Sequence, residues 1–265
     1  MKYELGFIGC GNMGGALVTS ATKTTDVKKI AVCDHNEAKV KKYENAYGVV
    51  GTTAEEVAKH ARFVVLGVKP QMMEAALAPI AAILRERTDV VVITMAAGLS
   101  ISAIRGYIQK ELPIIRIMPN TPATLGAGMI LYTANGVRAE EEQAFLRAFA
   151  KAGTFDALPE EKIDGGSALS GCGPAFVYAF VDALSKGGEE CGLTKEQALL
   201  YATKTLLGAG EMLLEYKDPA ALIKAVCSPN GTTLAGMRAL EDADFTNIAK
   251  SAVLAAYKRT LELKK

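Results

Sequence analysis

Short, continuous runs of apolar residues recur through the first 158 residues and alternate with stretches of helical spacing. The runs are rich in β-branched residues and lie at 5–8, 30–33, 63–66, 90–93, 114–117, 129–132 and 154–156. Continuous apolar runs are typical of parallel strands that are buried on both faces of a sheet. The helical stretches between them, such as 37–46, predict right-handed β-α-β crossovers. We therefore predict an α/β domain with a parallel sheet over residues 1–158, with the last two runs as edge strands.

The pattern changes after Pro159, because no strand-like run occurs from there to Lys265. Long apolar stretches of helical spacing follow, and they are interrupted at Gly192, Asp218-Pro219, Pro229 and Asp242. In the last stretch, which Asp244 would cap, one face consists of Phe245, Ile248, Ala249, Ala252, Val253, Ala256 and Leu261. Many positions hold alanine or glycine, and such small residues let helices approach closely. We predict an all-helical domain over residues 159–265, and we favour an interleaved dimer over a solitary bundle.

Composition and charge narrow the class of function. Half of the residues are apolar and 22% are charged, which predicts a packed core. The formal net charge is +1, so no electrostatic partnership with nucleic acid or a membrane surface is expected. No apolar run approaches the roughly 20 residues of a membrane span, and the start lacks the layout of a signal peptide.

Cysteines and histidines are few and scattered. The five cysteines are Cys10, Cys33, Cys172, Cys191 and Cys227, an odd number without a Cys-x-x-Cys pair. This spacing predicts reduced thiols in a cytoplasmic protein rather than disulfides or a zinc site. With only two histidines, His35 and His60, neither metal chemistry nor histidine acid–base catalysis is expected.

A Gly-x-Gly-x-x-Gly motif occupies residues 9–14, between the first predicted strand and the helical stretch after it. In that setting the glycines allow a tight turn, close approach of the backbone to a pyrophosphate, and close helix–strand packing. Asp34 stands twenty residues after Gly14, at the end of the next predicted strand. An ordinary glycine-rich turn is the alternative, but position and spacing favour a dinucleotide site.

The residue at the end of the second predicted strand bears on the choice of cofactor. The Asp34 carboxylate would accept hydrogen bonds from the adenosine ribose and repel a 2′-phosphate, which points to NADH. However, Lys39, Lys41 and Lys42 would supply charge for a phosphate, and Asp34 would alternatively serve as a helix cap. We therefore expect NADPH or NADH as the cofactor and leave the choice between them open.

Three further segments follow later strands of the predicted sheet, at 68–70, 95–98 and 118–122. Ligands of open α/β sheets lie at the carboxyl ends of the strands, so these segments would surround the nicotinamide half of the cofactor. Each segment alone is equally consistent with a simple connection, but together with the glycine motif they favour a site. The predicted cofactor-binding residues are Ile8, Gly9, Cys10, Gly11, Asn12, Met13, Gly14, Asp34, Val68, Lys69, Pro70, Met95, Ala96, Ala97 and Asn120.

A second anion site is predicted in the helical part of the chain. Residues 227–233 read Cys-Ser-Pro-Asn-Gly-Thr-Thr, a turn after which a helical stretch begins. Pro229 and Gly231 would shape the turn, and Thr232 and Thr233 would lie in the first helical turn. A helix start offers free backbone N–H groups and the positive end of the helix dipole to a carboxylate-sized anion. The Thr233 hydroxyl would add a group that both donates and accepts a hydrogen bond.

These motifs resemble, in the same order and nearly end to end, the landmarks of the pyrroline-5-carboxylate reductase family. The resemblance rests on residues 7–14, 68–70, 96–98, 118–122, 170–176 and 227–233, of which the last two segments are the most specific. It implies an N-terminal Rossmann-type domain, a helical C-terminal dimerisation domain, and assembly of dimers into a decamer. It also implies reduction of 1-pyrroline-5-carboxylate to L-proline by NADPH or NADH.

The resemblance places Ser228, Thr232 and Thr233 where the family holds the substrate carboxylate and ring nitrogen, and three positions depart from its pattern. The family usually has a small polar residue in place of Asp34, which puts a preference for NADPH in doubt. Cys172 replaces a serine of similar size, so we expect little effect. Asn230 replaces a glycine, and the turn is expected to survive because asparagine tolerates left-handed backbone.

We hypothesise that backbone amides of residues 231–234, together with Ser228, bind the substrate carboxylate. Thr233 would be the catalytic residue, because its hydroxyl would hydrogen-bond the ring nitrogen and orient the C=N carbon. The cofactor would carry the hydride chemistry while the protein supplies position and electrostatics. The predicted substrate-binding residues are Ser228, Gly231, Thr232 and Thr233.

The source of the proton for the ring nitrogen stays open, because the motifs contain no obvious side-chain acid. Either the substrate arrives with its ring nitrogen already protonated, or water or Thr233 relays a proton to that nitrogen. Glu215 is more typical of a solvated helix surface, and Lys69 of packing or a cofactor contact. The segment 170–174 has two interpretations: a wall of the substrate pocket, or a helix-entry turn with Pro174 near the first helical position.

Two other classes of function are also consistent with the order of the domains. A β-hydroxyacid dehydrogenase or related imine reductase would also join the two kinds of domain, but the dehydrogenases use a helix-borne lysine. The helical stretch after Gly173 has no lysine until Lys186, which counts against them. A non-catalytic dinucleotide-sensing scaffold is the other alternative, and the anion turn at 229–233 counts against it.

Overall fold

The computed structural model describes residues 1–263, which form two compact units. Of the described residues, the first unit comprises 1–172 and 256–263, and the second comprises 173–255. The sequence pattern places the domain boundary at 158/159, whereas the compact units divide after Cys172. The reason is that helix α8 (Glu160–Ser170) packs on the sheet, where Ile163 is fully buried against Met118 and Leu131.

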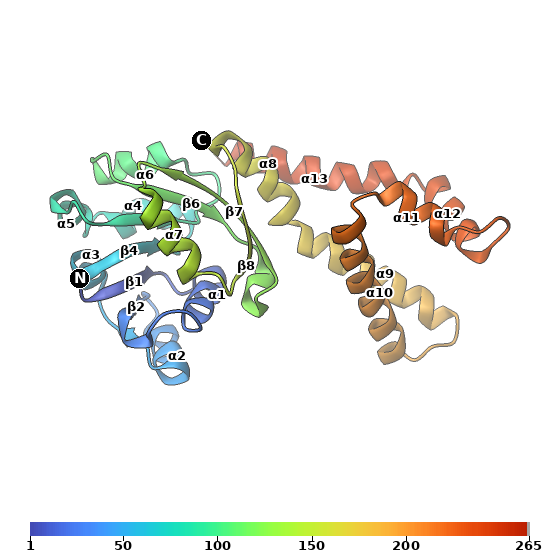
Figure 1. Cartoon of the computed structure of the whole chain (residues 1–265), viewed down its shortest axis with the longest axis horizontal. Helices are drawn as coiled ribbons and strands as arrows, with labels where there is room; N and C mark the ends of the chain where they lie inside the picture. Colours follow the sequence, from blue (N-terminus) through green and yellow to red (C-terminus); the bar gives the residue numbers. More distant parts are fainter. Residues whose placement is uncertain (264–265) are drawn as a thin grey trace. The chain divides into compact units, whose positions relative to one another are not determined.

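The first unit is built on an eight-stranded sheet with the order β3-β2-β1-β4-β5-β6-β7-β8 (Figure 1). Its strands are β1 (Tyr3–Ile8), β2 (Ile30–Cys33), β3 (Val50–Gly51), β4 (Ala61–Leu66), β5 (Val91–Thr94), β6 (Ile114–Met118), β7 (Gly128–Asn135) and β8 (Gly153–Ala157). All neighbouring strands are parallel except β6 and β7. The link between those two is shorter than the dozen or so residues that a parallel crossover requires, so the chain turns back.

Helices cover both faces of this sheet, as the continuous apolar strands predict. Along β4, Phe63 and Val65 point into one core and Val64 and Leu66 into the other, because successive side chains alternate between faces. The first core is closed by α1 (Asn12–Ala21), α2 (Glu37–Tyr47) and α7 (Ala139–Ala148). The second core is closed by α3 (Ala54–His60), α4 (Met73–Leu77), α5 (Ala81–Glu86) and α6 (Ile101–Ile108). Short 3-10 turns are η1 (Val27–Lys29), η2 (Pro70–Met72) and η3 (Thr121–Leu125).

The second unit is helical, as predicted, and no strand is assigned after Ala157 within residues 1–263. Its helices are α9 (Gly173–Glu190), α10 (Lys195–Tyr216), α11 (Pro219–Val226), α12 (Thr232–Asp242) and the first part of α13 (Phe245–Glu262). Few of its side chains are buried, among them Val181 and Ala202. Its exposed apolar side chains include Val177, Tyr178, Leu184, Leu199, Leu200, Tyr201, Leu207, Met212, Leu214, Tyr216, Ile248 and Leu254. Apolar surface of this extent marks a protein–protein interface.

One helical stretch, Glu160–Glu190, is long and apolar enough to cross a membrane by length and composition alone. The sequence pattern predicts no such stretch, because α8 and α9 interleave their apolar residues with charged ones such as Asp164, Asp182 and Lys186. A single stretch of this kind is weak evidence for a span. Its first part packs on the sheet through Ile163, which is fully buried.

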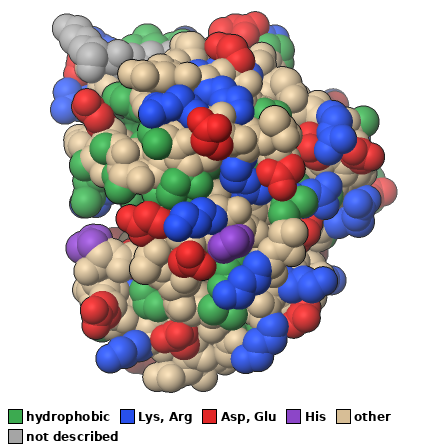
Figure 2. Space-filling model, turned by 90° about the vertical axis from the view of Figure 1, so that its left-hand side faces the viewer, with side chains coloured by type: hydrophobic (Ala, Val, Ile, Leu, Met, Phe, Trp, Pro, Cys, Tyr) green, Lys and Arg blue, Asp and Glu red, His purple; other side chains and the backbone are tan. Residues whose placement is uncertain are grey.

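The surface of the first unit is mixed in charge. On the side shown in Figure 2, acidic and basic side chains are interspersed and apolar side chains lie in small groups. This distribution agrees with a formal net charge of +1. A mixed surface provides no extended field of one sign on that side to attract a polyanion.

Candidate functional site

The glycine motif forms a tight turn between β1 and α1. Gly9 has a φ of +96°, a backbone conformation that favours glycine, and its N–H donates to the Cys33 carbonyl at 2.8 Å. A Cβ at Gly9 would lie only 2.7 Å from the Gly67 carbonyl carbon, at the end of β4. β1 lies between β2 and β4, where the order of the sheet reverses. The turn therefore stands at the position where open α/β sheets bind ligands.

The start of α1 is open to an anion. Gly11 is its N-cap residue, no side chain caps the helix, and no acidic residue lies in the first turn. A Cβ at Gly11 would meet no atom within 4 Å, so the backbone is accessible there. Uncapped N–H groups and the helix dipole fit the pyrophosphate of a dinucleotide.

A cavity of about 640 Å³ adjoins this helix start. It is lined by Cys10, Gly11, Asn12, Gly15, Ala16, Thr19, Lys39, Lys42, Tyr43, Tyr47, Thr121 and Thr124. The rings of Tyr43 and Tyr47 are stacked, with centroids 6.3 Å apart. Two lysines and two phenols give this cavity both charge and flat apolar surface, which suits the phosphate and adenosine parts of a dinucleotide.

Asp34 directly follows β2, as predicted, but its carboxylate is turned into the protein. The side chain is 3% exposed, and it accepts hydrogen bonds from the N–H groups of Cys10 at 2.8 Å and Asn36 at 3.0 Å. Lys39 lies 3.6 Å away. Burial alone would raise the pKa of Asp34, but the two amides and Lys39 lower it overall. In this arrangement Asp34 fixes the glycine turn itself.

The two cysteines beside this turn are desolvated. Cys10 and Cys33 are both buried, and the Cys10 thiol lies 3.7 Å from the Cys33 carbonyl oxygen. Burial, with the nearby Asp34 carboxylate, raises the pKa of each thiol to about 12. Neither thiol is therefore a nucleophile at neutral pH.

The other predicted cofactor residues lie at the same edge of the sheet. Val68, Lys69 and Pro70 follow β4, with Lys69 exposed and Pro70 opening η2. Residues 95–97 follow β5, and Asn120 follows β6. Because β1, β2, β4, β5 and β6 are parallel, their carboxyl ends share one edge. The structure thus brings these predicted residues together.

Asn120 does more than line that edge. Its side chain donates to the Ser170 carbonyl at 2.9 Å and accepts from the Met129 N–H at 2.9 Å. It does not cap η3, although asparagine is a favoured cap and stands at the N-cap position. Both ends of its amide are therefore engaged within the first unit.

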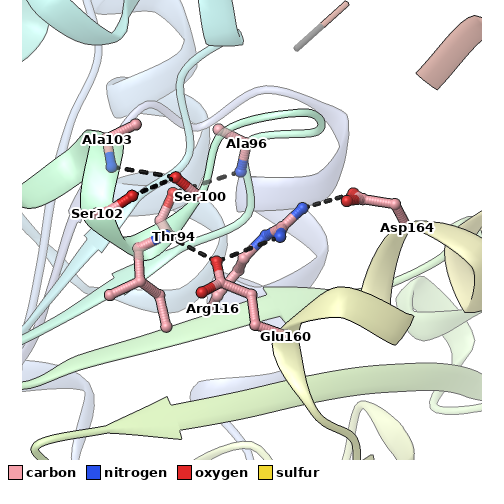
Figure 3. A network of polar contacts seen from close by, with 9 residues as sticks. Thr94, Ala96, Ser100, Ser102, Ala103, Arg116, Glu160 and Asp164 are labelled. Atoms are coloured by element: carbon pink, nitrogen blue, oxygen red, sulfur yellow. Dashed lines mark hydrogen bonds and ion pairs between the residues drawn. The ribbon is translucent and has the colours of Figure 1, made fainter. Parts of the chain in front are cut away.

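A buried ion cluster, shown in Figure 3, ties α8 to the sheet and was not anticipated from the sequence. Arg116 of β6 is 1% exposed and pairs with Asp164 at 2.6 Å and with Glu160 at 3.4 Å. Glu160 also accepts from the Ile101 N–H at 2.7 Å, at the start of α6. The sequence does contain a signal for this cluster: Arg116 interrupts an otherwise apolar strand. A charge buried in this way requires a partner of opposite charge.

The predicted anion turn forms in the second unit. Asn230 has a φ of +57°, so the asparagine adopts the left-handed conformation that was expected to preserve the turn. Gly231 is the N-cap of α12, and its N–H donates to the Ser228 carbonyl at 3.0 Å. No side chain caps the helix, and no acidic residue lies in its first turn. Thr232 and Thr233 begin α12 with exposed side chains.

Groups typical of other chemistries are missing from the described residues. Within residues 1–263, no cluster of three or more His, Cys, Asp and Glu side chains is arranged for a metal ion. The first lysine of α9 is Lys186, which is exposed and pairs with Asp182 at 2.7 Å. It lies on the fourth turn of the helix, so no lysine stands near the start of α9 for the acid–base role of a hydroxyacid dehydrogenase.

Two family models and many full-length relatives match this chain. Residues 160–263 match the family described as "Pyrroline-5-carboxylate reductase dimerisation", and residues 4–98 match "NADP oxidoreductase coenzyme F420-dependent". The pyrroline-5-carboxylate reductase of Synechocystis sp. is 37% identical over all of both chains. That of Escherichia coli is 33% identical over 99% of this chain and 97% of its own.

Solved structures agree along the whole chain. A pyrroline-5-carboxylate reductase from Coxiella burnetii superposes with a TM-score of 0.90 at 32% identity, covering all of both chains. The Plasmodium falciparum pyrroline carboxylate reductase with NADP bound has a TM-score of 0.89 at 27% identity, again over all of both chains. Similarity over the full length, in sequence and in structure, leads to one conclusion: this chain belongs to the pyrroline-5-carboxylate reductase family.

Proposed function

We propose that this chain reduces the C=N bond of 1-pyrroline-5-carboxylate to give L-proline, with NADPH or NADH as the reductant. The observation that carries the proposal is the pair of uncapped, acid-free helix starts at Gly11 and Gly231. One suits a dinucleotide pyrophosphate and the other a small carboxylate. Full-length relatives with this activity support the same conclusion.

In the first unit, the protein's task is to hold the reductant. The backbone at Gly11 and the start of α1 would bind the pyrophosphate, and Lys39 and Lys42 line the adjoining cavity. When bound, the reduced nicotinamide supplies the hydride. The Asp34 carboxylate is turned onto the Cys10 amide, and Lys39, which pairs with it at 3.6 Å, lines the cavity together with Lys42. Two lysines in the cavity suit a 2′-phosphate, so we infer that the chain accepts NADPH as well as NADH.

In the second unit, the protein's task is to orient the imine acid. The first N–H groups of α12 would bind the carboxylate together with the Ser228 hydroxyl, because an uncapped helix start stabilises an anion. The Thr233 hydroxyl, one residue into the helix, would hydrogen-bond the ring nitrogen and hold the proton there. Positioning the C=N carbon in this way accelerates the reaction by converting an encounter into an oriented contact.

Self-association follows from the dimerisation domain, and we propose an interleaved dimer, with dimers assembling into a decamer. The exposed apolar side chains of α9 and α10, such as Tyr178, Leu200 and Leu207, support the dimer. All five cysteines are free thiols, which supports a reducing cytoplasmic location.

Substitution of Thr233 tests the proposed mechanism. Thr233→Ala should lower kcat/KM for 1-pyrroline-5-carboxylate at least about tenfold, the scale of one lost hydrogen bond to a charged group. Thr233→Ser keeps the hydroxyl and should retain most of the activity, and Thr88→Val on an exposed loop is the control. Wild-type turnover with unchanged kinetics in Thr233→Ala would remove Thr233 from the mechanism.

A further inference from the structure

We propose that Asn120 is a positioning residue for the reduction: it holds the turn at residues 170–172 against the carboxyl edge of the sheet. The inference rests on the proposed function and on one of the two interpretations of residues 170–174, namely that they form a wall of the substrate pocket. The carrying observation is the Asn120 amide, which joins three elements at once and is 9% exposed. In this role Asn120 acts through the turn, and a direct contact with the cofactor, which the sequence predicts, is the alternative that the experiments below separate from it.

The C-terminal end of α8 takes a hydrogen bond from outside the helix. The last carbonyl groups of a helix lack partners within the helix and need an outside donor. Ser170 is the last residue of α8, and the Asn120 amide donates to its carbonyl at 2.9 Å. The Ser170 hydroxyl turns back to the Gly166 carbonyl at 3.1 Å, so it is committed within the helix. Asn120 therefore serves as the C-terminal cap of α8 from another element.

Asn120 itself is held in place by the sheet. It follows β6 directly, and its carbonyl oxygen accepts from Met129 in β7. β6 and β7 are adjacent strands, so the amide is held in register with the sheet. Gly171 and Cys172 come immediately after the carbonyl that it binds, and their N–H groups reach back to the Ser167 carbonyl. Any shift of Asn120 is consequently transmitted to this turn.

The N-terminal end of α8 is anchored independently of Asn120. Glu160 accepts from Ile101, and Arg116 pairs with Asp164 in the interior (Figure 3). That cluster fixes the first turns of α8, and the Asn120 amide holds its last residue, Ser170, to the edge of the sheet. Loss of the amide should therefore displace the turn while the body of the helix stays in place.

Asn120→Asp is the most specific substitution. It keeps the shape of the side chain and the oxygen that accepts from the Met129 N–H, but it replaces the NH2 group that donates to the Ser170 carbonyl. An ionised carboxylate repels the Ser170 carbonyl oxygen, whereas a protonated one donates to it. Burial and the facing Ser170 carbonyl oxygen both raise the pKa of an aspartate at this position, and the N–H of Met129 opposes them. The ratio of variant to wild-type kcat/KM should fall about tenfold between pH 5.5 and pH 8.5.

Two further measurements separate positioning from cofactor contact and from simple misfolding. NADPH affinity, measured by fluorescence titration without substrate, should change less than about threefold, because the cofactor loops keep their contacts. Hydrogen exchange in the peptide over 166–172 should accelerate at pH 8.5, while exchange in β1 stays unchanged. Asn120→Ser, which removes the amide without adding charge, should lower kcat/KM equally at both pH values. Asn45→Asp, on the exposed face of α2, is the matched control for Asn120→Asp.

The outcomes are distinct. A kcat/KM for Asn120→Asp equal to that of the wild type at pH 8.5, or unchanged kinetics in Asn120→Ser, would overturn the inference. NADPH affinity that weakens in parallel with kcat/KM would make Asn120 a direct cofactor ligand and overturn it as well. A wild-type enzyme that does not reduce 1-pyrroline-5-carboxylate would instead overturn the proposed function, and the exchange measurement would still report on the turn.

Discussion

The buried pair of Arg116 and Asp164 offers the clearest stability prediction. Arg116→Met would leave the Asp164 carboxylate, which is 1% exposed, without the guanidinium that lies 2.6 Å away. Breaking a buried pair by removing one partner costs about 3–5 kcal/mol, because the attraction of the guanidinium no longer offsets the cost of burying the carboxylate. The contact with Glu160 is longer, at 3.4 Å, and Glu160 is one-third exposed, so solvent screens it and it adds little.

For a unit of this size, each kcal/mol shifts the melting temperature by about 2–4 °C. Arg116→Met should therefore lower Tm by roughly 6–20 °C. The measurement is a thermal scan by circular dichroism at a fixed protein concentration, since association also shifts Tm. Arg147→Met, on the exposed face of α7, is the matched control and should stay within about 0.5 kcal/mol of the wild type.

A double variant tests the reasoning behind this magnitude. Arg116→Met combined with Asp164→Leu removes both charges and fills the site with apolar atoms, so most of the lost stability should return. A double variant as unstable as Arg116→Met alone would refute the electrostatic explanation. A shift below about 2 °C in Arg116→Met would refute the claim that the pair is essential to the attachment of α8.

Three further predictions concern the turns and thiols. Because the folded pKa of Asp34 is lowered, its stabilising contribution is present above the unfolded pKa near 3.9 and is lost as pH falls through the folded pKa. Asp34→Asn should therefore be less stable than the wild type by about 1–3 kcal/mol at pH 7 in urea unfolding. The difference should vanish in acid, and a difference that persists unchanged in acid would contradict this assignment. Cys10 and Cys33, with pKa values raised to about 12, should resist iodoacetamide at pH 8 in the native protein and react after unfolding, as mass spectrometry would show; rapid native labelling of either would disprove their desolvation. Ser228→Ala should raise KM for the imine acid about five- to tenfold and leave KM for NADPH unchanged, whereas an effect on NADPH alone would separate Ser228 from the carboxylate site.

Much of the fold follows from the periodicity of the chain. Continuous β-branched runs predict the long strands of the sheet to within a few residues, because burial on both faces leaves little freedom in their composition. β3 was not predicted, since the two residues Val50 and Gly51 are too short to produce a pattern. The start of α12 and the left-handed Asn230 were predicted, because proline, glycine and asparagine act on the local backbone.

The contacts that fix the candidate site were harder to predict. Arg116 and Asp164 are 48 residues apart, and nothing in the local pattern of either identifies the other. Asp34 was expected at the end of β2, but its inward hydrogen bond to the Cys10 amide depends on how the glycine turn closes. The hydrogen bond from the Asn120 amide to the Ser170 carbonyl likewise arises only when α8 lies on the sheet. Such tertiary pairings are set by topology rather than by neighbours in sequence.

The most direct test of the central claim follows the hydride itself. The purified enzyme would receive 1-pyrroline-5-carboxylate and NADPH in which both hydrogens at C4 of the nicotinamide are deuterium. Loss of nicotinamide absorbance should match the formation of L-proline, and mass spectrometry should find a single deuterium on the ring carbon that was double-bonded to nitrogen. Cofactor binding without turnover, or proline that carries no deuterium, would contradict the account.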